Sequence, residues 1–578
     1  MKMKISEYIA GFLVKQGVSD IFGYQGTMIA YLVDAICKQK KIKNHTCYHE
    51  QGAAFAAVGY AKATGKVGVA YATSGPGAMN LMSGIADAYF DSTPTVFFTG
   101  QLNLNEYTDI PTLRQQGFQQ MNVISAVKSY TKFCKQIRKK EDIRYILEKA
   151  FFLAQDGRKG PVVIDIPMNI QKEIIEPDTL KGFCPAQSVL KEEDYHKAAF
   201  LILEKIRLAK RPLVLLGNGI QKNSHGHITI MKFIHKLNIP FITSLPAYHL
   251  VSYGDECEFG YLGAAYGSRE ANLLANQKAD LIVSFGCSMC RRQTGGNPEK
   301  FAKNAEIIRV DLDEEEIKRK VHKEELSLCL DYEKLVYRLL DNIDFHISDN
   351  WFYVCKKSRQ IMRDFDKQAT YGEGNLYMQT ISELHENAGN VFSDVGQHQI
   401  WAAQSYKTRK HQRLLFSGGH GAMGFALPAA IGGYYSSGKQ SIVLCGDGAI
   451  QMNIQEFQWL YREQLPIFVY IFNNHSLGLI RQQQNDFFDG NHFGSAEEEY
   501  TTPSFVSIAH AYGIDADEIH TIEDLKKAVS SADQKKPHVF EIFINADSAA
   551  YPKTYFGEEM HNQRPYLPSD IQKVLEEL

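Results

Sequence analysis

The chain has 578 residues, enough for about three or four domains, and its 44% hydrophobic and 22% charged content is that of an ordinary soluble protein. A formal net charge of −3 argues against a general attraction to nucleic acid or membrane surfaces. No stretch approaches the roughly 18 apolar residues of a membrane span, and the N-terminus lacks the apolar run of a signal peptide. We therefore expect a cytoplasmic protein. Among the ten cysteines, Cys287 and Cys290 have no second pair or histidine cluster nearby, which favours free thiols over zinc.

Residues 1–175 alternate helical and strand signals, which is typical of a doubly wound α/β domain. Strands are predicted at 67–72, 95–99 and 161–166. The turn from Ser74 to Gly77 leads into a helix that we expect to start near Asn80. A loose segment at 176–190, with Pro177 and Pro185, is the predicted linker.

A second α/β unit is predicted over 191–345, with strands at 213–216, 241–243, 281–285 and 307–310. A charged connecting helix over 346–370 follows, and a third α/β unit covers 371–548. The tail, 549–578, is rich in X-Pro pairs and is expected to run extended over the surface before a short terminal helix. The predicted fold class is α/β, with three consecutive doubly wound parallel sheets.

Two apolar runs of the third unit end in polar side chains. Residues 441–445 lead into Gly446-Asp447-Gly448, and residues 467–472 lead into Asn473-Asn474. Ligands of open α/β sheets bind at the carboxyl ends of strands, and carboxylate and carboxamide oxygens suit Mg²⁺. GDG turns are common by themselves. The combination with NN at this spacing resembles the thiamine diphosphate (ThDP) motif.

Longer collinear motifs extend this resemblance over the chain from Ile5 to about Asp547. The first unit contains HEQGAA at 49–54 and GYAKATGKVGVAYATSGPGAMN at 59–80. The third contains SDVGQHQIWAAQ at 393–404 and SGGHGAMGFALPAA at 417–430. The chain thus resembles acetolactate synthase large subunits, within the ThDP-dependent decarboxylases and carboligases. The stretch LRQQGFQQMNVISAVKSYTK and the tail are similar to relatives that act in branched-sugar and surface-polysaccharide pathways.

The resemblance implies a pyrimidine-binding first domain, a central FAD-type domain and a third domain that binds the diphosphate and Mg²⁺. It implies that Glu50 contacts N1′ of the aminopyrimidine and relays a proton, a role that suits a carboxyl group. Taken alone, Glu50 would be an ordinary acid in a helix first turn, and His398 an ordinary core histidine. The implied metal ligands are Asp447, Asn474 and the main-chain carbonyl of Ser476. The other implied ThDP-binding residues are Gly26, Thr73, Gly77, Asn80, Gln397, His398, Gly421, Met423, Gly446, Gly448, Ala449 and Gly478.

The flavin pattern of the family is only partly kept. Gly217-Asn-Gly219 looks like the start of a dinucleotide fold, but Lys222 replaces the third glycine of GxGxxG, so that fingerprint fails. In the family's own pattern, Ser288 replaces an arginine and Arg291 replaces an acid. The resemblance still implies FAD, the alternative being a structural domain without cofactor. The residues implied to contact FAD are Arg158, Gly217, Gly219, Leu262, Gly263, Gly286, Arg292 and Asp311.

On the substrate side, the resemblance implies that Gln101, Phe118, Gln119 and Lys128 line the pocket, the last two as catalytic residues. Each could instead be a surface polar group or a core aromatic residue. Acetolactate synthases of branched-chain amino acid synthesis carry a tryptophan where this chain has Gln483. A polar, smaller side chain there favours a hydroxylated acceptor over an apolar ethyl group.

The predicted function is a ThDP- and Mg²⁺-dependent carboligase, a transferase of the transketolase class. It would decarboxylate pyruvate and pass the two-carbon unit to a second carbonyl compound, such as a nucleotide-linked keto-sugar. The alternatives are formation of 2-acetolactate from two pyruvates, a simple 2-oxo acid decarboxylase or oxidase, and a non-catalytic relative. The absence of an HH dipeptide argues against the decarboxylase. The resemblance also implies a homodimer or homotetramer with active sites between chains.

Overall fold

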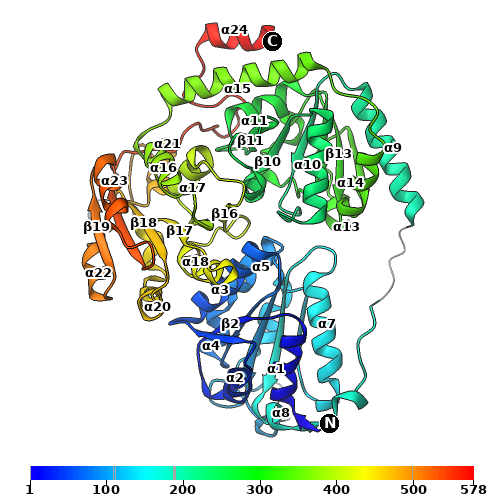
Figure 1. The fold of residues 1–578 in the computed structure, drawn as a ribbon, viewed down its shortest axis with the longest axis vertical. Helices are drawn as coiled ribbons and strands as arrows, with labels where there is room; N and C mark the ends of the chain where they lie inside the picture. Colours follow the sequence, from blue (N-terminus) through cyan, green and yellow to red (C-terminus); the bar gives the residue numbers. More distant parts are fainter. Residues whose placement is uncertain (1, 109, 111, 186–190, 497–498) are drawn as a thin grey trace.

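The computed structural model describes residues 2–108, 110, 112–185, 191–496 and 499–578. In this part of the chain, three parallel sheets of six strands follow one another, each surrounded by helices (Figure 1). The predicted α/β fold with three doubly wound sheets is thereby confirmed. The domain limits at 175, 191, 345, 371 and 548 stay predictions, and positions 186–190 of the predicted linker lie outside the described residues.

The first unit has the strand order β3-β2-β4-β5-β7-β6, so the order reverses between β2 and β4. Buried apolar runs form its central strands, as expected for a parallel sheet covered on both faces. Its strands are β2 (Asp20–Gly23), β3 (Lys43–Thr46), β4 (Gly68–Ala72), β5 (Thr95–Gln101), β6 (Phe133–Gln136) and β7 (Pro161–Pro167). Its main helices are α1 (Ile5–Lys15), α2 (Ala30–Cys37), α3 (Glu50–Thr64), α4 (Pro76–Asn80), α5 (Met82–Phe90), α6 (Val123–Val127), α7 (Ile143–Gln155) and α8 (Met168–Lys172), and β1 (Met3–Lys4) pairs with β8 (Ile174–Ile175).

One boundary in this unit differs from the prediction. The helix expected to start near Asn80 begins at Pro76, and Asn80 is the last residue of α4. Gly75 has a φ of 59°, a conformation that favours glycine, and Pro76 then occupies the first helical turn. The turn residues thus start the helix at once.

The third unit repeats the strand order of the first, as β16-β15-β17-β18-β20-β19, and reverses between β15 and β17. Its strands are β15 (Asn390–Ser393), β16 (Arg413–Phe416), β17 (Ser441–Gly446), β18 (Ile467–Asn473), β19 (Asp515–Ile519) and β20 (His538–Phe543). Its helices are α16 (Glu373–Leu384), α17 (Gln397–Ser405), α18 (Ala426–Ser437), α19 (Asp447–Gln451), α20 (Phe457–Glu463), α21 (Gly478–Phe487), α22 (Phe505–Ala511) and α23 (Ile522–Ser531).

The central unit has the order β11-β10-β9-β12-β13-β14, which is that of a Rossmann sheet and reverses between β9 and β12. Its strands are β9 (Pro212–Leu216), β10 (Phe241–Ser244), β11 (Glu258–Leu262), β12 (Leu281–Phe285), β13 (Glu306–Asp311) and β14 (Glu325–Cys329). Its helices are α9 (Glu192–Leu208), α10 (His225–Leu237), α11 (Arg269–Leu273), α12 (Arg291–Thr294), α13 (Glu314–Lys318) and α14 (Tyr332–Asp341).

The first and third units of the same chain share one hydrophobic core, in which α3 packs directly on α18. Small residues allow the two backbones to meet. A Cβ atom on Gly59 would lie 2.1 Å from the Ala429 oxygen, and one on Gly432 would lie 1.9 Å from the Ala56 oxygen. Figure 1 shows α3 and α18 together where the two units meet. The two units therefore form one tightly packed body.

The predicted connecting helix is present as α15 (Asp349–Ala369), and the terminal helix as α24 (Ser569–Glu577). The tail between β20 and α24 lacks regular structure, as predicted, but it does more than cover the surface. The amides of Asn272 and Gln563 bond the carbonyls of Met560 and Gly267, respectively, so the tail is tied to the central unit. Gln563 is 1% exposed, which places part of the tail in the interior.

Candidate functional site

A cavity of about 160 Å³ lies at the carboxyl ends of β15, β17 and β18 in the third unit. This is the point where the strand order reverses, the usual ligand position in an open α/β sheet. Predicted cofactor residues line it: Gln397, His398, Met423, Gly446, Asp447, Gly448, Ala449, Asn474, Ser476 and Gly478. Gly421, also predicted, is not among the lining residues and adopts a φ of 70° in the turn ahead of Met423.

Two predicted metal ligands converge in this cavity. The main-chain N–H of Ser476 lies 3.3 Å from Oδ2 of Asp447 and 3.2 Å from Oδ1 of Asn474. The carboxylate and carboxamide oxygens are therefore near neighbours. Burial raises the pKa of Asp447 to about 6, and the described groups that donate to its carboxylate are neutral, namely the N–H groups of Gly448 and Ser476 and the hydroxyl of Tyr500. A buried carboxylate without a cation, beside an amide oxygen, fits a divalent metal with oxygen ligands.

The predicted diphosphate side of the cavity has a buried polar atom without a partner. Nε2 of His398 makes no hydrogen bond within the described part of the chain, and burial lowers the pKa of His398 to about 3. A Cβ atom on Gly478 would lie 2.1 Å from Oε1 of Gln397, so only glycine fits beside that amide. These features fit a bound anion held through the metal and nearby donor groups.

A second cluster lies in the first unit, around Glu50. Oε2 of Glu50 accepts a hydrogen bond of 2.9 Å from Asn80 Nδ2. Gly77 faces Oε1, since a Cβ atom there would lie 2.9 Å from it. Gly26 packs on Thr73, whose buried hydroxyl has no hydrogen-bond partner among the described residues. Five predicted residues are thus brought together, and Glu50 is only 8% exposed.

The two clusters are separate within one chain. Every residue that lines the third-unit cavity belongs to residues 395–544, and none of the described residues of the first unit reaches it. The predicted substrate residues Phe118 and Gln119 lie in the first unit, near the first cluster. Gln119 has a φ of 59° and its carbonyl packs against Gly75, while Phe118 is 79% exposed.

The remaining substrate candidates, Gln101, Lys128 and Gln483, differ in burial. Gln101 is buried and its amide bonds the carbonyl of Met121 at 2.9 Å. Lys128 is exposed at the end of α6. Gln483 is exposed on α21, whereas its neighbours Gln482 and Gln484 are buried and bonded to main-chain carbonyls. No described contact joins these residues to one another.

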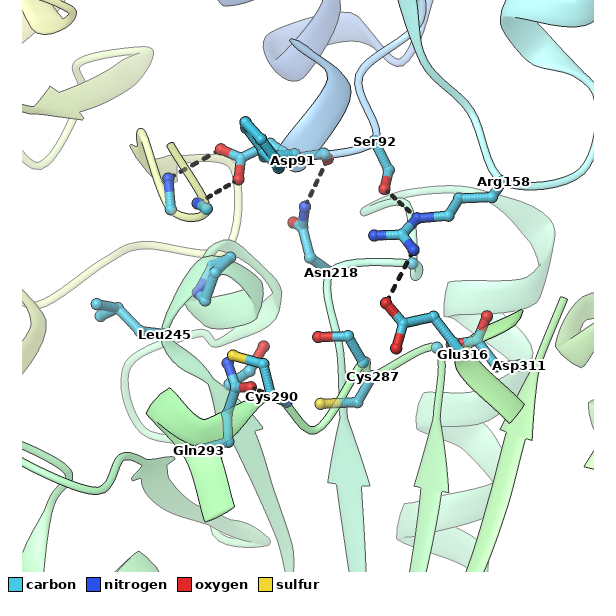
Figure 2. Close-up of a pocket in the computed structure, with 18 of the residues that line it drawn as sticks. Asp91, Ser92, Arg158, Asn218, Leu245, Cys287, Cys290, Gln293, Asp311 and Glu316 are labelled. Atoms are coloured by element: carbon cyan, nitrogen blue, oxygen red, sulfur yellow. Dashed lines mark hydrogen bonds and ion pairs between the residues drawn. The ribbon is translucent and has the colours of Figure 1, made fainter. Parts of the chain in front are cut away.

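A second cavity, of about 580 Å³, lies among all three units (Figure 2). It opens at the carboxyl ends of β9, β12 and β13, where the central sheet reverses. Arg158 bonds Ser92 Oγ at 2.9 Å and pairs with Asp313 and Glu316 at 2.9 and 3.0 Å. Burial raises the pKa of Asp311. The predicted flavin residues in the lining are Arg158, Gly219, Leu262, Gly263, Gly286, Arg292 and Asp311.

Gly217 is the predicted flavin residue that does not line this cavity. A Cβ atom on Gly217 would lie 2.0 Å from the Gly286 oxygen, so this glycine serves the close approach of two loops. The cavity volume lies within the range of cofactor sites, and the carboxyl group of Asp311 at the end of β13 can accept a hydrogen bond from a hydroxyl group. The residues therefore fit a dinucleotide.

Some site residues were missed by sequence reasoning. Trp401 and Ile544 line the third-unit cavity, and the hydroxyl of Tyr500 donates to Asp447 at 3.1 Å. Trp401 lies within the motif at 393–404, a signal that could have been used. Tyr500 follows Asp447 by more than fifty positions on an irregular segment, and no spacing rule connects the two.

Within the described residues, no helix combines the length and the apolar character that crossing a bilayer requires.

Comparisons with known proteins agree with this arrangement. Residues 3–128, 201–339 and 394–542 match the N-terminal binding, central and C-terminal binding domains of thiamine pyrophosphate enzymes, respectively. The acetolactate synthase large subunit of Lactococcus lactis is 33% identical, over 95% of this chain and 93% of the relative. Acetolactate synthase 2, chloroplastic, of Nicotiana tabacum is 34% identical, over 94% of this chain and 82% of the relative. The acetolactate synthase large subunit of Buchnera aphidicola is 32% identical, over 96% of this chain and 97% of the relative. The chain belongs to the thiamine pyrophosphate enzymes, in the family of the acetolactate synthase large subunits.

Proposed function

We propose that the chain is a ThDP- and Mg²⁺-dependent carboligase that decarboxylates pyruvate and transfers the two-carbon unit to a second carbonyl compound. The observation that carries this proposal is the convergence of Asp447 and Asn474 on one N–H group in a cavity of a ThDP-binding domain. The names of the relatives support the same reaction class.

The roles of the residues follow from their chemistry. When bound, ThDP supplies the carbon nucleophile and the electron sink that decarboxylation of a 2-oxo acid requires. Asp447, Asn474 and the carbonyl of Ser476 would hold Mg²⁺, and the metal would hold the diphosphate. Glu50 would hold a proton at N1′ of the aminopyrimidine, and Met423 would support the cofactor from below. A buried carboxyl group that can give and take a proton suits such a relay.

The active assembly is a dimer or a tetramer, with Glu50 of one chain facing the metal cavity of another. The separation of the two clusters within one chain supports this arrangement, because α3 and α18 are already locked together by backbone contact. Exposed apolar side chains in the first unit, Phe118 and Met79 among them, would be covered in such an assembly.

The acceptor is a larger polar ketone, such as a nucleotide-linked keto-sugar, rather than 2-oxobutyrate. Gln483 supports this choice, since an exposed amide on α21 offers a donor and an acceptor but no apolar wall. Formation of 2-acetolactate from two pyruvates is the second candidate, because the relatives are acetolactate synthases.

The test is to incubate the purified protein with pyruvate and a panel of keto acids and keto-sugars, and to identify products by mass. We expect a keto-sugar adduct and, with equal pyruvate and 2-oxobutyrate, no strong preference for acetohydroxybutyrate. A strong excess of acetohydroxybutyrate would return the chain to branched-chain amino acid synthesis. Release of CO₂ with acetaldehyde as the only product would make it a simple decarboxylase.

The central cavity binds FAD in this proposal. Its volume, the Rossmann strand order and the position of Asp311 support a dinucleotide, while Arg292, which bonds the carbonyl of Gly418, offers a positive charge to the diphosphate. Protein purified without stripping should be yellow. An absorption spectrum without a flavin band would leave the cavity without this cofactor.

A further inference from the structure

A short segment of the third unit forms hydrogen bonds with the residues on both sides of Glu50. The segment runs from Asn453 to Glu456 and begins two residues after the end of α19, the helix that begins with Asp447. We call these four residues the clamp. Both carboxylate oxygens of Glu456 accept the N–H of Tyr48 at 3.2 Å, two residues before Glu50. Nδ2 of Asn453 donates to Oε1 of Gln51 at 3.0 Å, directly after Glu50.

The packing around Glu456 leaves it no alternative position. Glu456 is fully buried, and a Cβ atom on Gly52 would lie 2.3 Å from its Oε1. Gly52 thus makes room for the carboxyl group within the first turn of α3. Burial raises the pKa of Glu456 to about 8, and the N–H groups of Tyr48 and His49 counteract this effect. A buried carboxyl group that bonds main-chain N–H groups is costly to displace.

The clamp also bonds the turn ahead of α18 in its own unit. Nδ2 of Asn453 donates to the carbonyl of Gly424 at 2.8 Å, next to Met423. The first turn of α3 starts at His49, whose Nδ1 accepts the N–H of Gln51 at 3.1 Å. Glu50 itself is bonded only through Asn80 among the described side-chain hydrogen bonds. The backbone on either side of Glu50 is therefore held by the third unit of the same chain.

We propose that Glu456 and Asn453 are positioning residues that fix the first turn of α3, so that Glu50 is presented at the correct place for proton transfer. Neither residue touches the reacting atoms, and both act through Glu50. The inference rests on the proposed role of Glu50. Its physical basis is that a displacement of a catalytic group by about 1 Å can cost about 10²-fold in rate.

The test measures exchange of the ThDP C2 proton with deuterium in the absence of substrate, together with ThDP affinity and the melting temperature of the protein without cofactor. Glu456→Gln keeps the shape but replaces one of the two oxygens that accept the Tyr48 N–H by an NH₂ group, which cannot accept a hydrogen bond. We expect its C2 exchange to fall about 10- to 100-fold with unchanged ThDP affinity. Asn453→Ala, which leaves Glu456 in place, should show a smaller fall in C2 exchange. It replaces Glu456→Gln as the test variant if Glu456→Gln does not fold.

Glu325→Gln is the control for loss of a carboxylate elsewhere in the chain. The buried side chain of Glu325 accepts the N–H groups of Val321 and His322 and also pairs with Arg309, but it lies in the central unit. It should leave C2 exchange at the wild-type rate. The double variant Glu50→Gln/Glu456→Gln should exchange no more slowly than Glu50→Gln alone, because both changes act through one group.

The outcomes separate the two ideas. Slow exchange in Glu50→Gln with wild-type exchange in Glu456→Gln and Asn453→Ala would overturn the clamp alone. An additive loss in the double variant would show that Glu456 acts apart from Glu50 and would also overturn it. Wild-type exchange in Glu50→Gln would remove the proposed role of Glu50, and the clamp with it.

Discussion

At the scale of single residues, the two predicted clusters differ in what they hold. Glu50 is buried, Asn80 donates to its Oε2, and its Oε1 lies beside Gly77 without a hydrogen bond from any described side chain. Asp447 faces a cavity with an amide oxygen close by. The first arrangement suits a proton relay, and the second suits a metal.

Glu50→Gln should keep ThDP binding and lose most turnover. Glutamine has the same shape but cannot relay a proton, and loss of an acid–base group costs about 10²–10⁴-fold. Steady-state product formation and calorimetric ThDP binding on the same preparation measure the two effects. Wild-type turnover in this variant would exclude Glu50 from the mechanism.

Asp447→Ala should abolish Mg²⁺-dependent ThDP binding, because the metal would lose its only carboxylate ligand among the proposed set. Calorimetric titration with ThDP, with and without Mg²⁺, measures this directly. Glu541→Gln is a useful comparison, since Glu541 is a buried acid of the same sheet that bonds Asn473 and lies outside the cavity lining. Unchanged ThDP affinity in Asp447→Ala would show that the metal is misplaced.

At the scale of elements, glycines set how closely α3 and α18 approach. Gly432 meets the main chain of Ala56, whereas an added Cβ on Gly11 in α1 would meet no described atom within 4 Å beyond its own helix backbone and chain neighbours. The same substitution should therefore have opposite effects at the two positions.

Gly432→Ala should lower the melting temperature, since overpacking of this kind costs about 1–3 kcal/mol or more. Gly11→Ala should leave it unchanged or raise it, because alanine is favoured over glycine in a helix by up to about 1 kcal/mol. Thermal unfolding followed by circular dichroism compares the two. Equal melting temperatures would show that the α3–α18 contact relaxes easily.

Much of the fold could be predicted because parallel strands are short buried apolar runs with turn signals at their ends. The strand at 281–285 was predicted with its observed limits, and 213–216 and 307–310 were predicted within one residue at each end. The start of α4 was predicted too late, because Pro76 begins the helix directly after the turn. Asp447 and Asn474 could be found because each follows such a strand.

Contacts between distant segments could not be predicted in this way. Tyr48 and Glu456 are more than four hundred positions apart, and no periodic pattern in either segment connects them. The same holds for Tyr500 and Asp447, since residue 500 lies outside regular structure. Only the packing of the first unit on the third brings the clamp to Glu50.

At the scale of the whole molecule, the junction of the central and third units buries cationic and histidine side chains together. Burial, and then the charge of Arg413, lower the pKa of His249 to about 3. Nδ1 of His249 lies 2.9 Å from the carbonyl of Pro246 and donates to it. The junction thus requires a neutral histidine.

His249 binds a proton near pH 6.5 in the unfolded chain, whereas in the folded chain its pKa is about 3. The stability from His249 is therefore present above pH 6.5 and is lost as the pH falls. His249→Asn keeps a donor for Pro246 but does not titrate. The stability advantage of the wild type should shrink by about 1.4 kcal/mol per pH unit below 6.5. Melting curves at several pH values measure this, and a constant difference would contradict it.

The division of the proposed ThDP site into two clusters has a genetic consequence. If each chain lends Glu50 to one site and Asp447 to another, two inactive variants can complement each other. A mixed dimer of a Glu50→Gln chain and an Asp447→Ala chain would concentrate both defects in one site and leave the other intact. Random pairing of equal amounts would restore about a quarter of the sites. Co-expression with two affinity tags isolates the mixed dimer, and an inactive mixed dimer would show that each chain completes its own site.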